Sequence, residues 1–270
     1  MRPLFLVLLT ALATSAQAAD LQPKTVAAFD RYVQATERRM ADPAEPFLRV
    51  DGLPEAQRKA ALAALGKGEF VIDSLKTTDA GRNIDIPDGL IHHWVGVVFV
   101  PGANVNQAVA LLQDYDQHGV IYKPNVARSK LIERDGDRFK IYLRFFMKKI
   151  RTGVVNSEHE ALFTRNGPDR ASSRIYSTRI AQVDEPDTTN EREMPVGRDD
   201  GYIWRLNSYW RFLERDKGVY VQCESITLSR DFPFGTGWIL KPFTMSIPRD
   251  TLSFTLDTTR KWLQGRTGAK

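Results

Sequence analysis

The chain predicts an α+β fold in which a curved antiparallel sheet packs on one long C-terminal helix. Six stretches alternate apolar and polar residues and are separated by turn residues, as the strands of one sheet are: 126–134, 137–149, 153–165, 170–184, 201–215 and 217–230. Residues 248–264 then carry an apolar stripe at helical spacing, which includes Leu252, Leu256 and Leu263. A long helix with one apolar face needs an apolar surface to lie on, and the sheet supplies it.

The first 18 residues have the composition of a secretory leader. Arg2 precedes the apolar run 4–12, and small residues follow it up to Ala18. A positive start, a short apolar core and an A-x-A site predict a signal peptide cleaved after Ala18, and hence a periplasmic or secreted protein. The apolar run is shorter than the roughly 20 residues of a membrane-spanning helix.

Residues 19–89 predict an N-terminal extension of helices and a β-hairpin. Apolar residues at near-helical spacing predict a helix over 24–41, and Pro54 and Gly66 bracket a second helix over 54–65. A strand at 69–77 is expected to pair with the apolar stretch that ends at Val100.

Local signals specify several details of the following domain. Asn104 is expected to cap a short helix that leads into the six strands. A two-residue turn at Asp216-Lys217 pairs Trp210 with Cys223 across a hairpin. Within strand 137–149 an apolar set shares one face, while Lys140, Arg144 and the other alternate side chains mostly face water. That set is Phe139, Ile141, Leu143 and Phe145.

Two connections are longer than a hairpin needs. Residues 184–200 are acidic, contain two prolines and predict a mobile loop. Residues 231–247 hold Trp238 and several phenylalanines among glycines and prolines. These rings either close one end of the core, which we favour, or form a gate or lip that touches a membrane.

Composition and motifs exclude several function classes. The net charge of +5 is spread along the chain, so we expect no nucleic acid as a partner. The lone Cys223 cannot form an intramolecular disulfide and lies mid-strand as a small core residue. None of the four histidines has metal-ligand spacing, and no G-x-S-x-G, P-loop or G-x-G-x-x-G occurs. We therefore expect no metal, no cofactor and no catalytic residue.

Two segments resemble the START-like, or helix-grip, superfamily (SRPBCC), which includes lipid-transfer domains, plant allergen-type binders and aromatase/cyclase-like proteins. The first runs from the helix VALLQDYD at 109–116 to PNV at 124–126 and the strand start ARSKLIE at 127–133. The second runs from GVYVQCESI at 218–226 to LSR at 228–230, ahead of the final helix. The resemblance covers roughly 90–265 and implies a deep apolar cavity between the sheet and that helix.

The resemblance predicts a non-catalytic module, at 90–265, that binds or transfers a lipid or another apolar small molecule, and the leader predicts that it is exported. The alternative is a cyclase- or hydrolase-like enzyme that uses a pocket His, Tyr or Glu as an acid or base.

The cavity face depends on strand register, because a slip of one residue exchanges the two faces. We choose the register that places His159 inward rather than Glu158 and Glu160. Across the following turn this choice brings Arg174 and Tyr176 inward as well, and an inward Arg needs either an internal carboxylate or a ligand head group. The expected ligand-binding residues are His159, Arg174 and Tyr176 at the polar end and Trp204, Trp210, Phe145 and Leu256 as walls.

Overall fold

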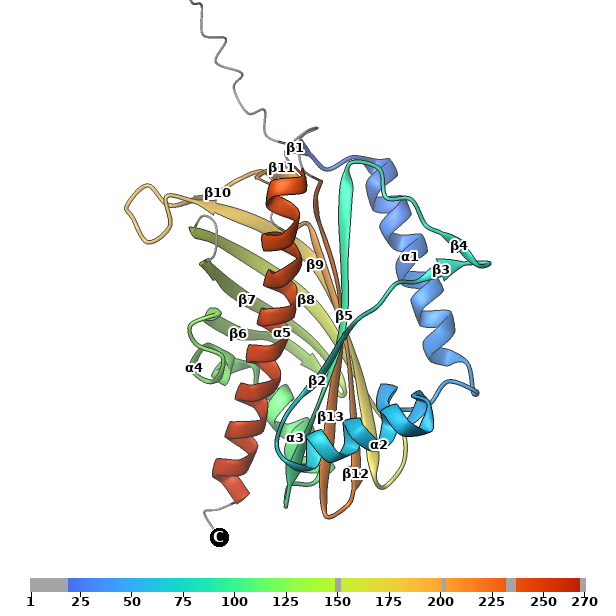
Figure 1. The fold of residues 1–270 in the computed structure, drawn as a ribbon. Helices are drawn as coiled ribbons and strands as arrows, with labels where there is room; N and C mark the ends of the chain where they lie inside the picture. The colour runs from blue at the N-terminus through green and yellow to red at the C-terminus, as the bar shows by residue number, and fades with distance from the viewer. Residues whose placement is uncertain (1–18, 149–151, 201–202, 232–236, 268–270) are drawn as a thin grey trace, which may run out of the picture.

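The structure is a computed structural model that describes residues 19–148, 152–200, 203–231 and 237–267. The expected signal peptide lies outside the described residues. The predicted architecture is confirmed: an antiparallel sheet packs on a C-terminal helix, with helices of the N-terminal extension beside it (Figure 1).

Within the described residues the main sheet has nine strands. Its path runs β2-β5-β13-β12-β9-β8-β7-β6, and β10 pairs with β9. The bounds are β2 Val71–Ser74, β5 Gly89–Pro101, β6 Val126–Asp135, β7 Arg138–Lys148, β8 Thr152–Arg165, β9 Arg170–Asp184, β10 Arg192–Glu193, β12 Arg205–Arg215 and β13 Gly218–Arg230. Two short pairs lie apart from this sheet: β1 (Ala19–Asp20) with β11 (Arg198–Asp199), and β3 (Thr78–Asp79) with β4 (Arg82–Asn83).

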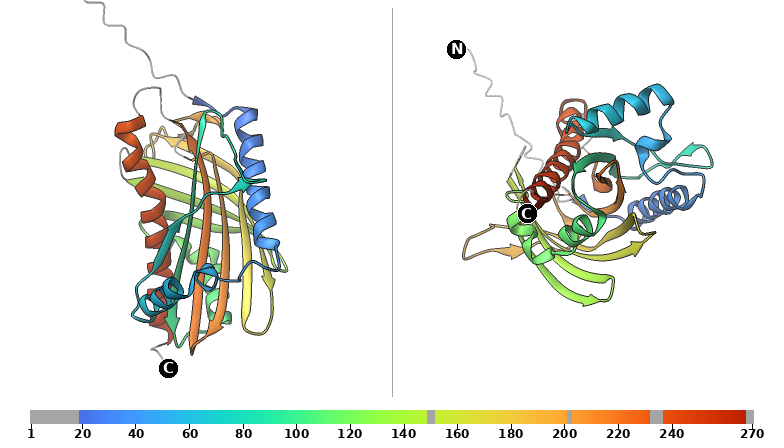
Figure 2. Two further views of the ribbon diagram at one scale, coloured as in Figure 1. Left: turned by 45° about the vertical axis from the view of Figure 1, so that its right-hand side comes forward. Right: turned by 90° about the horizontal axis from the view of Figure 1, so that it is seen from below.

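The helices cover both faces of this sheet. They are α1 Pro23–Ala41, η1 Arg49–Gly52, α2 Glu55–Gly66, α3 Val105–Gln113, η2 Tyr115–Gln117, α4 His118–Ile121 and α5 Gly237–Thr267. We call the face that packs on α3, α4 and α5 the inner face, and the face that packs on α1, η1 and α2 the outer face. Figure 2 shows the curved sheet from below, with α1 and α5 on different sides of it.

The role of the N-terminal extension follows from this arrangement. Phe29 and Tyr32 of α1 pack with Ile226 and Leu228 of β13, and Leu65 of α2 packs in a neighbouring cluster with residues of β5 and β12. The extension also adds β2 to the edge of the main sheet next to β5, as the sequence predicted. Residues 19–89 therefore supply α1, η1 and α2 to the outer face and β2 to the sheet itself.

Close contact between α5 and β5 depends on Gly96. A Cβ at this position would lie 2.4 Å from Leu256 Cδ1 and 3.3 Å from Leu252 Cδ2, so a side chain here would push the helix away. Leu256 and Leu263 are fully buried, and Leu252 is nearly so. The predicted apolar stripe of the helix thus faces the sheet, as expected from its spacing.

Other local predictions are confirmed. Asn104 and Gln107 form a capping box at the start of α3, with each side chain bonded to the other residue's backbone N–H. The Asp216-Lys217 turn sets the register of β12 and β13, so that Trp210 lies opposite Cys223.

Two expectations about connections are wrong. Helix α5 begins at Gly237, so most of the expected aromatic loop 231–247 has a helical backbone. The helix contains both Pro242 and Pro248. Proline is typical of the first turn of a helix, and this helix was therefore expected to start at Pro248. Side chains of residues 232–246 are outside the description, so membrane contact there stays a prediction.

The acidic segment 184–200 is not a free loop. Arg144 is 2% exposed, and its guanidinium donates two hydrogen bonds to Glu191, at 2.9 and 2.8 Å. The Arg144 guanidinium lowers the pKa of Glu191 to about 2. Arg144 was expected to face water, but this segment folds over it and pairs with β9 through β10.

Candidate functional site

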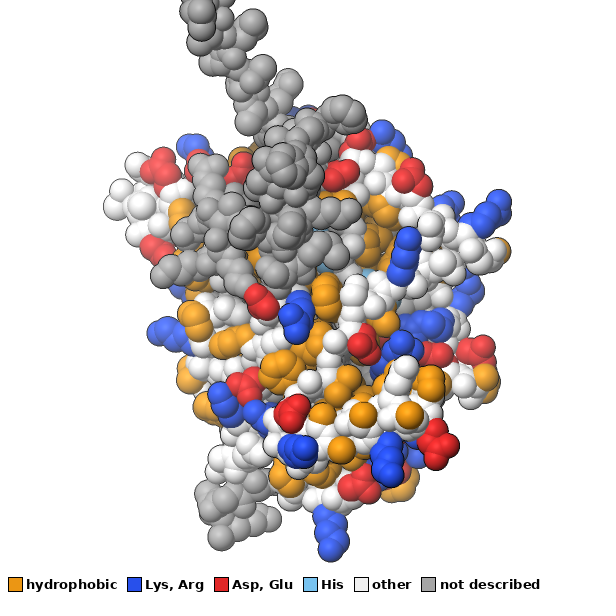
Figure 3. Space-filling view, in the orientation of Figure 1, with side chains coloured by type: hydrophobic (Ala, Val, Ile, Leu, Met, Phe, Trp, Pro, Cys, Tyr) orange, Lys and Arg blue, Asp and Glu red, His pale blue; other side chains and the backbone are white. Residues whose placement is uncertain are grey.

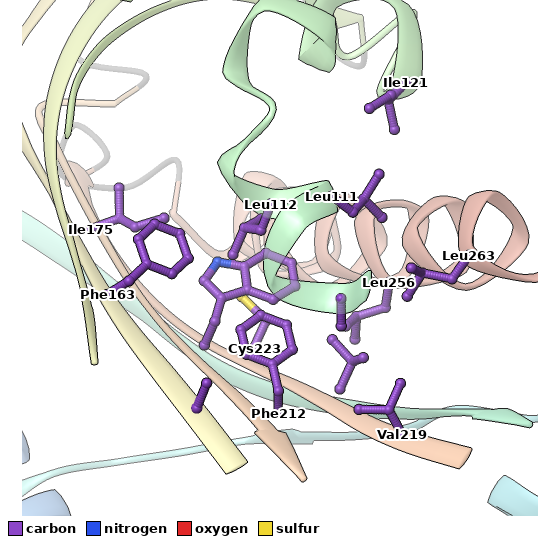
Figure 4. Close-up of a cluster of buried hydrophobic side chains, with 14 of the residues drawn as sticks. Leu111, Leu112, Ile121, Phe163, Ile175, Phe212, Val219, Cys223, Leu256 and Leu263 are labelled. Carbon is purple, nitrogen blue, oxygen red and sulfur yellow. The ribbon is translucent and has the colours of Figure 1, made fainter. Parts of the chain in front are cut away.

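The inner core is an apolar layer between the sheet, α5 and the short helices. Figure 4 shows side chains of α3, α4 and α5 converging on strand residues of the inner face. Leu111 comes from α3, Phe163 from β8, Phe212 from β12 and Leu256 from α5, and all are at least 95% buried. Trp210 belongs to the same cluster and stacks on Phe212, with ring centroids 6.3 Å apart.

Half-buried apolar side chains of several elements pack against this core. Those from β6, β7 and α5, which we call the rim, are Leu131, Leu143, Phe145, Phe254 and Trp262. Rim residues are accessible to solvent and also contact the core.

Several buried polar atoms in the inner layer lack partners. Within the described part of the chain, these atoms have no hydrogen bond although each residue is at least 95% buried: Tyr115 Oη, His118 Nε2, His159 Nδ1 and Ser173 Oγ. An unsatisfied buried donor or acceptor costs about 1–3 kcal/mol. Native proteins usually meet such atoms with water or a ligand.

His159 is the best defined of these groups. Its side chain is 2% exposed, and its ring lies 6.3 Å from the ring of the rim residue Phe145, edge to face. Burial lowers the pKa of His159 to about 4, so the imidazole is neutral at pH 7. His159 is therefore a neutral polar group directly behind the rim.

The outer face offers a contrast, because a chain of hydrogen bonds joins several of its buried polar side chains. Tyr32 Oη donates to His93 Nδ1 at 3.0 Å and accepts from the Thr77 N–H at 2.8 Å. His93 Nε2 donates to Glu224 Oε1 at 2.8 Å, and Arg39 donates to the same oxygen. This chain of contacts links α1 to the sheet and leaves no open group for a ligand, so it is structural.

Four of the predicted site residues are brought together. Phe145, His159, Trp210 and Leu256 all lie on the inner side. The other three are not there. Arg174 is exposed on the outer face, Tyr176 donates a hydrogen bond to Glu37 of α1, and Trp204 packs in the α1 cluster.

The error for Arg174 and Tyr176 has a simple cause. The connection from β8 to β9 is one residue longer than assumed, because the Asn166 N–H bonds to the Arg170 carbonyl and pairing resumes between Arg165 and Ala171. His159 is consequently opposite Ser177. The β8 register was chosen correctly, since Glu158 and Glu160 are exposed, but the face of β9 is reversed.

Trp204 and the expected inward arginine need separate corrections. Trp204 precedes β12, and its indole N–H donates to Asp199 at 3.1 Å on the α1 side. Arg179, on the same strand as Arg174, pairs with Glu193. Arg174 and Arg179 therefore both lie on the outer face, and the expected inward arginine is wrong for this strand.

Sequence reasoning missed Tyr115, His118, Ser157 and Ser173. His118 is 5% exposed, and its ring lies 4.9 Å from that of Tyr115. Ser173 shares a strand face with Ala171 and Ile175, and this pattern would have predicted its inward position if the length of the turn before β9 had been known.

Other chemistry finds little support among the described residues. Three or more His, Cys, Asp or Glu side chains nowhere gather in a geometry that could hold a metal. Cys223 is buried, and burial raises its thiol pKa, so it is not an activated nucleophile. Charges of both signs intermingle on the face shown in Figure 3.

Two cavities occur outside the inner core. One of about 250 Å³ lies between α1 and the sheet and is lined by Asp30, Glu37 and Arg205 among others. The other, of about 350 Å³, is lined largely by charged side chains of β6 to β9 such as Lys140 and Arg174. Neither of these two cavities is lined by α5.

No described helix is both long and apolar enough to cross a membrane. No protein-family model matches the chain, and no curated protein matches it.

Solved structures with a similar fold include three of different kinds. The STAR-related lipid transfer protein of Xanthomonas axonopodis is 16% identical, with a TM-score of 0.46, and the match covers 72% of this chain and 98% of that one. The Zhui aromatase/cyclase of Streptomyces sp. R1128 is 11% identical, with a TM-score of 0.44, over 67% and 98%. Human STARD10 is 10% identical, with a TM-score of 0.45, over 80% and 84%. These likenesses concern the fold, and the ligand has to follow from the residues of this chain.

Proposed function

We propose that this protein binds, and passes on, a lipid or another apolar small molecule held between the inner face and α5, without catalysing a reaction. The observation that carries the proposal is the set of unpartnered polar atoms inside an apolar layer. Burying such atoms is costly, and a ligand with a polar group would remove the cost while filling the layer.

The rim gives this ligand a route. Because Phe145 and Leu143 pack against the core, a ligand that enters past the rim would have to move these side chains aside. Apolar contact would then stabilise the complex by roughly 25 cal/mol per Å² of buried surface. Half-buried residues are the ones that can move at least cost, since they lose the fewest contacts.

Native mass spectrometry of the protein purified from its own host tests the proposal. We expect co-purified apolar molecules with the wild type and weaker retention with Phe145→Ala. Ile132→Ala is the matched control, because Ile132 is 51% exposed on the neighbouring strand β6. A wild-type protein that carries no ligand and takes up none from mixed lipid vesicles would contradict the proposal.

The proposal includes export to the periplasm or beyond. It is supported by the leader-like composition of residues 1–18. N-terminal sequencing of the recovered protein should begin at Ala19, whereas a chain beginning at Met1 in the cytoplasmic fraction would contradict export.

An enzyme of the cyclase or hydrolase kind is the second candidate, favoured by the neutral His159 with its open Nδ1. A neutral imidazole could act as a general base. The adjacent Ser157 is not an activated nucleophile, because its hydroxyl donates to the Leu143 carbonyl at 3.0 Å. Hydrolysis of p-nitrophenyl esters that disappears in His159→Phe would favour this candidate.

A further inference from the structure

The hydrogen bonds around His159 define which of its ring nitrogens carries the proton. Ser157 has one hydroxyl proton, and it is donated to the Leu143 carbonyl oxygen at 3.0 Å. The contact of 2.9 Å between Ser157 Oγ and His159 Nε2 therefore needs its proton from the imidazole. Nε2 carries the proton, and Nδ1 is left as a bare acceptor with its lone pair in the core.

A second histidine in the same layer has the same character. His118 is 5% exposed, and its Nε2 is unpartnered within the described residues. Burial lowers the pKa of His118 to about 4 as well, so this ring is also neutral. The layer thus holds a second unpartnered imidazole nitrogen besides Nδ1 of His159.

No described charged side chain is fully buried in the inner layer. Among the described residues, the buried Arg, Lys, Asp and Glu side chains are Arg144, Asp199 and Glu224. Arg144 contacts Glu191, Asp199 contacts Trp204, and Glu224 contacts His93, all away from the inner core. A carboxylate or phosphate buried at His159 Nδ1 would meet a lone pair and no fully buried cation.

We infer that the ligand is an uncharged, mostly apolar molecule whose hydroxyl, or equivalent N–H group, donates a hydrogen bond to His159 Nδ1. The inference rests on the proposed function and narrows it to neutral donors such as long-chain or polycyclic alcohols. Fatty acids and phospholipids with buried head groups are excluded at this position. His159 is a specificity-determining residue in this account.

Displacement of the fluorescent apolar probe N-phenyl-1-naphthylamine, at pH 7, tests the inference with three competitors: decan-1-ol, 1-methoxydecane and decanoate. The alcohol and the ether share a decyl chain but differ in the donor. We expect the alcohol to bind at least about tenfold more tightly than the ether, which corresponds to about 1.4 kcal/mol. His159→Phe should abolish this difference between the alcohol and the ether.

The outcomes separate the inference from the proposed function. Equal affinities for alcohol and ether, or tighter binding of decanoate, would overturn the inference while apolar binding stands. Failure of the fluorescent probe and of all three competitors would overturn the binding function itself.

Nitrogen-15 NMR of the wild type provides a check that needs no variant. The His159 signals should show a protonated Nε2, and the Nδ1 signal should move on addition of decan-1-ol. A protonated Nδ1 in the free protein, or an Nδ1 signal unmoved by bound alcohol, would equally refute the inference.

Discussion

Truncation of Leu256 should show how much of the stability depends on the contact between α5 and the sheet. Leu256 is fully buried, and its Cδ1 occupies the space above Gly96. Leu256→Ala removes that contact and leaves a cavity that the rigid sheet cannot close. Buried Leu→Ala substitutions cost about 3 to 5 kcal/mol when the site does not collapse. For a chain of this size the melting temperature should fall by roughly 6 to 20 °C.

Urea unfolding followed by circular dichroism measures this loss, with Thr251→Ala as the matched control. Thr251 is exposed on the same helix, so alanine there should change stability by only about ±0.5 kcal/mol. A loss below about 1 kcal/mol for Leu256→Ala, or a loss equal to that of the control, would refute the packing of α5 on β5.

Three more predictions follow from the same structure. Gly96→Val should destabilise the protein by about 1 to 3 kcal/mol, because the new side chain overpacks against α5. Gly66→Ala is the control, because its Cβ would meet no atom within 4 Å, and thermal melts compare the melting temperatures of the two variants. The free energy of unfolding should fall as the pH decreases from 6.5 to 4, by up to about 1.4 kcal/mol per pH unit for each neutral buried histidine. Burial lowers the pKa of His118 and His159 to about 4, so in this window the unfolded chain binds protons that the folded chain excludes. Urea titrations between pH 6.5 and 4 that show no change in stability would contradict this prediction. Glu224→Leu should leave His93 Nε2 without its acceptor and Arg39 with Glu45 as its carboxylate partner. Amide exchange in α1 should then become faster while exchange in α5 stays slow, and unchanged exchange in α1 would show that these contacts do not hold the helix.

The candidate site shows where sequence reasoning stops. The inward placement of Phe139, Ile141 and His159 followed from alternation along single strands, because one apolar face must meet a core. Alternation could not predict which residues of β9 lie beside His159, since a connection that is one residue longer moves every following side chain to the other face of the sheet. Arg174 was misplaced for this reason alone.

The sequence by itself determined the strands, the capped helix α3, the stripe of α5 and the turn at Asp216-Lys217, because each depends on neighbours a few residues away. Only the tertiary structure decided that α1 covers the outer face, that Arg144 is buried beneath an acidic segment and that His159 keeps a bare nitrogen in the core. Burial and hydrogen-bond satisfaction depend on which distant segments meet. A local sequence pattern does not specify these long-range contacts, so the buried polar groups of this protein could be identified only from the folded structure.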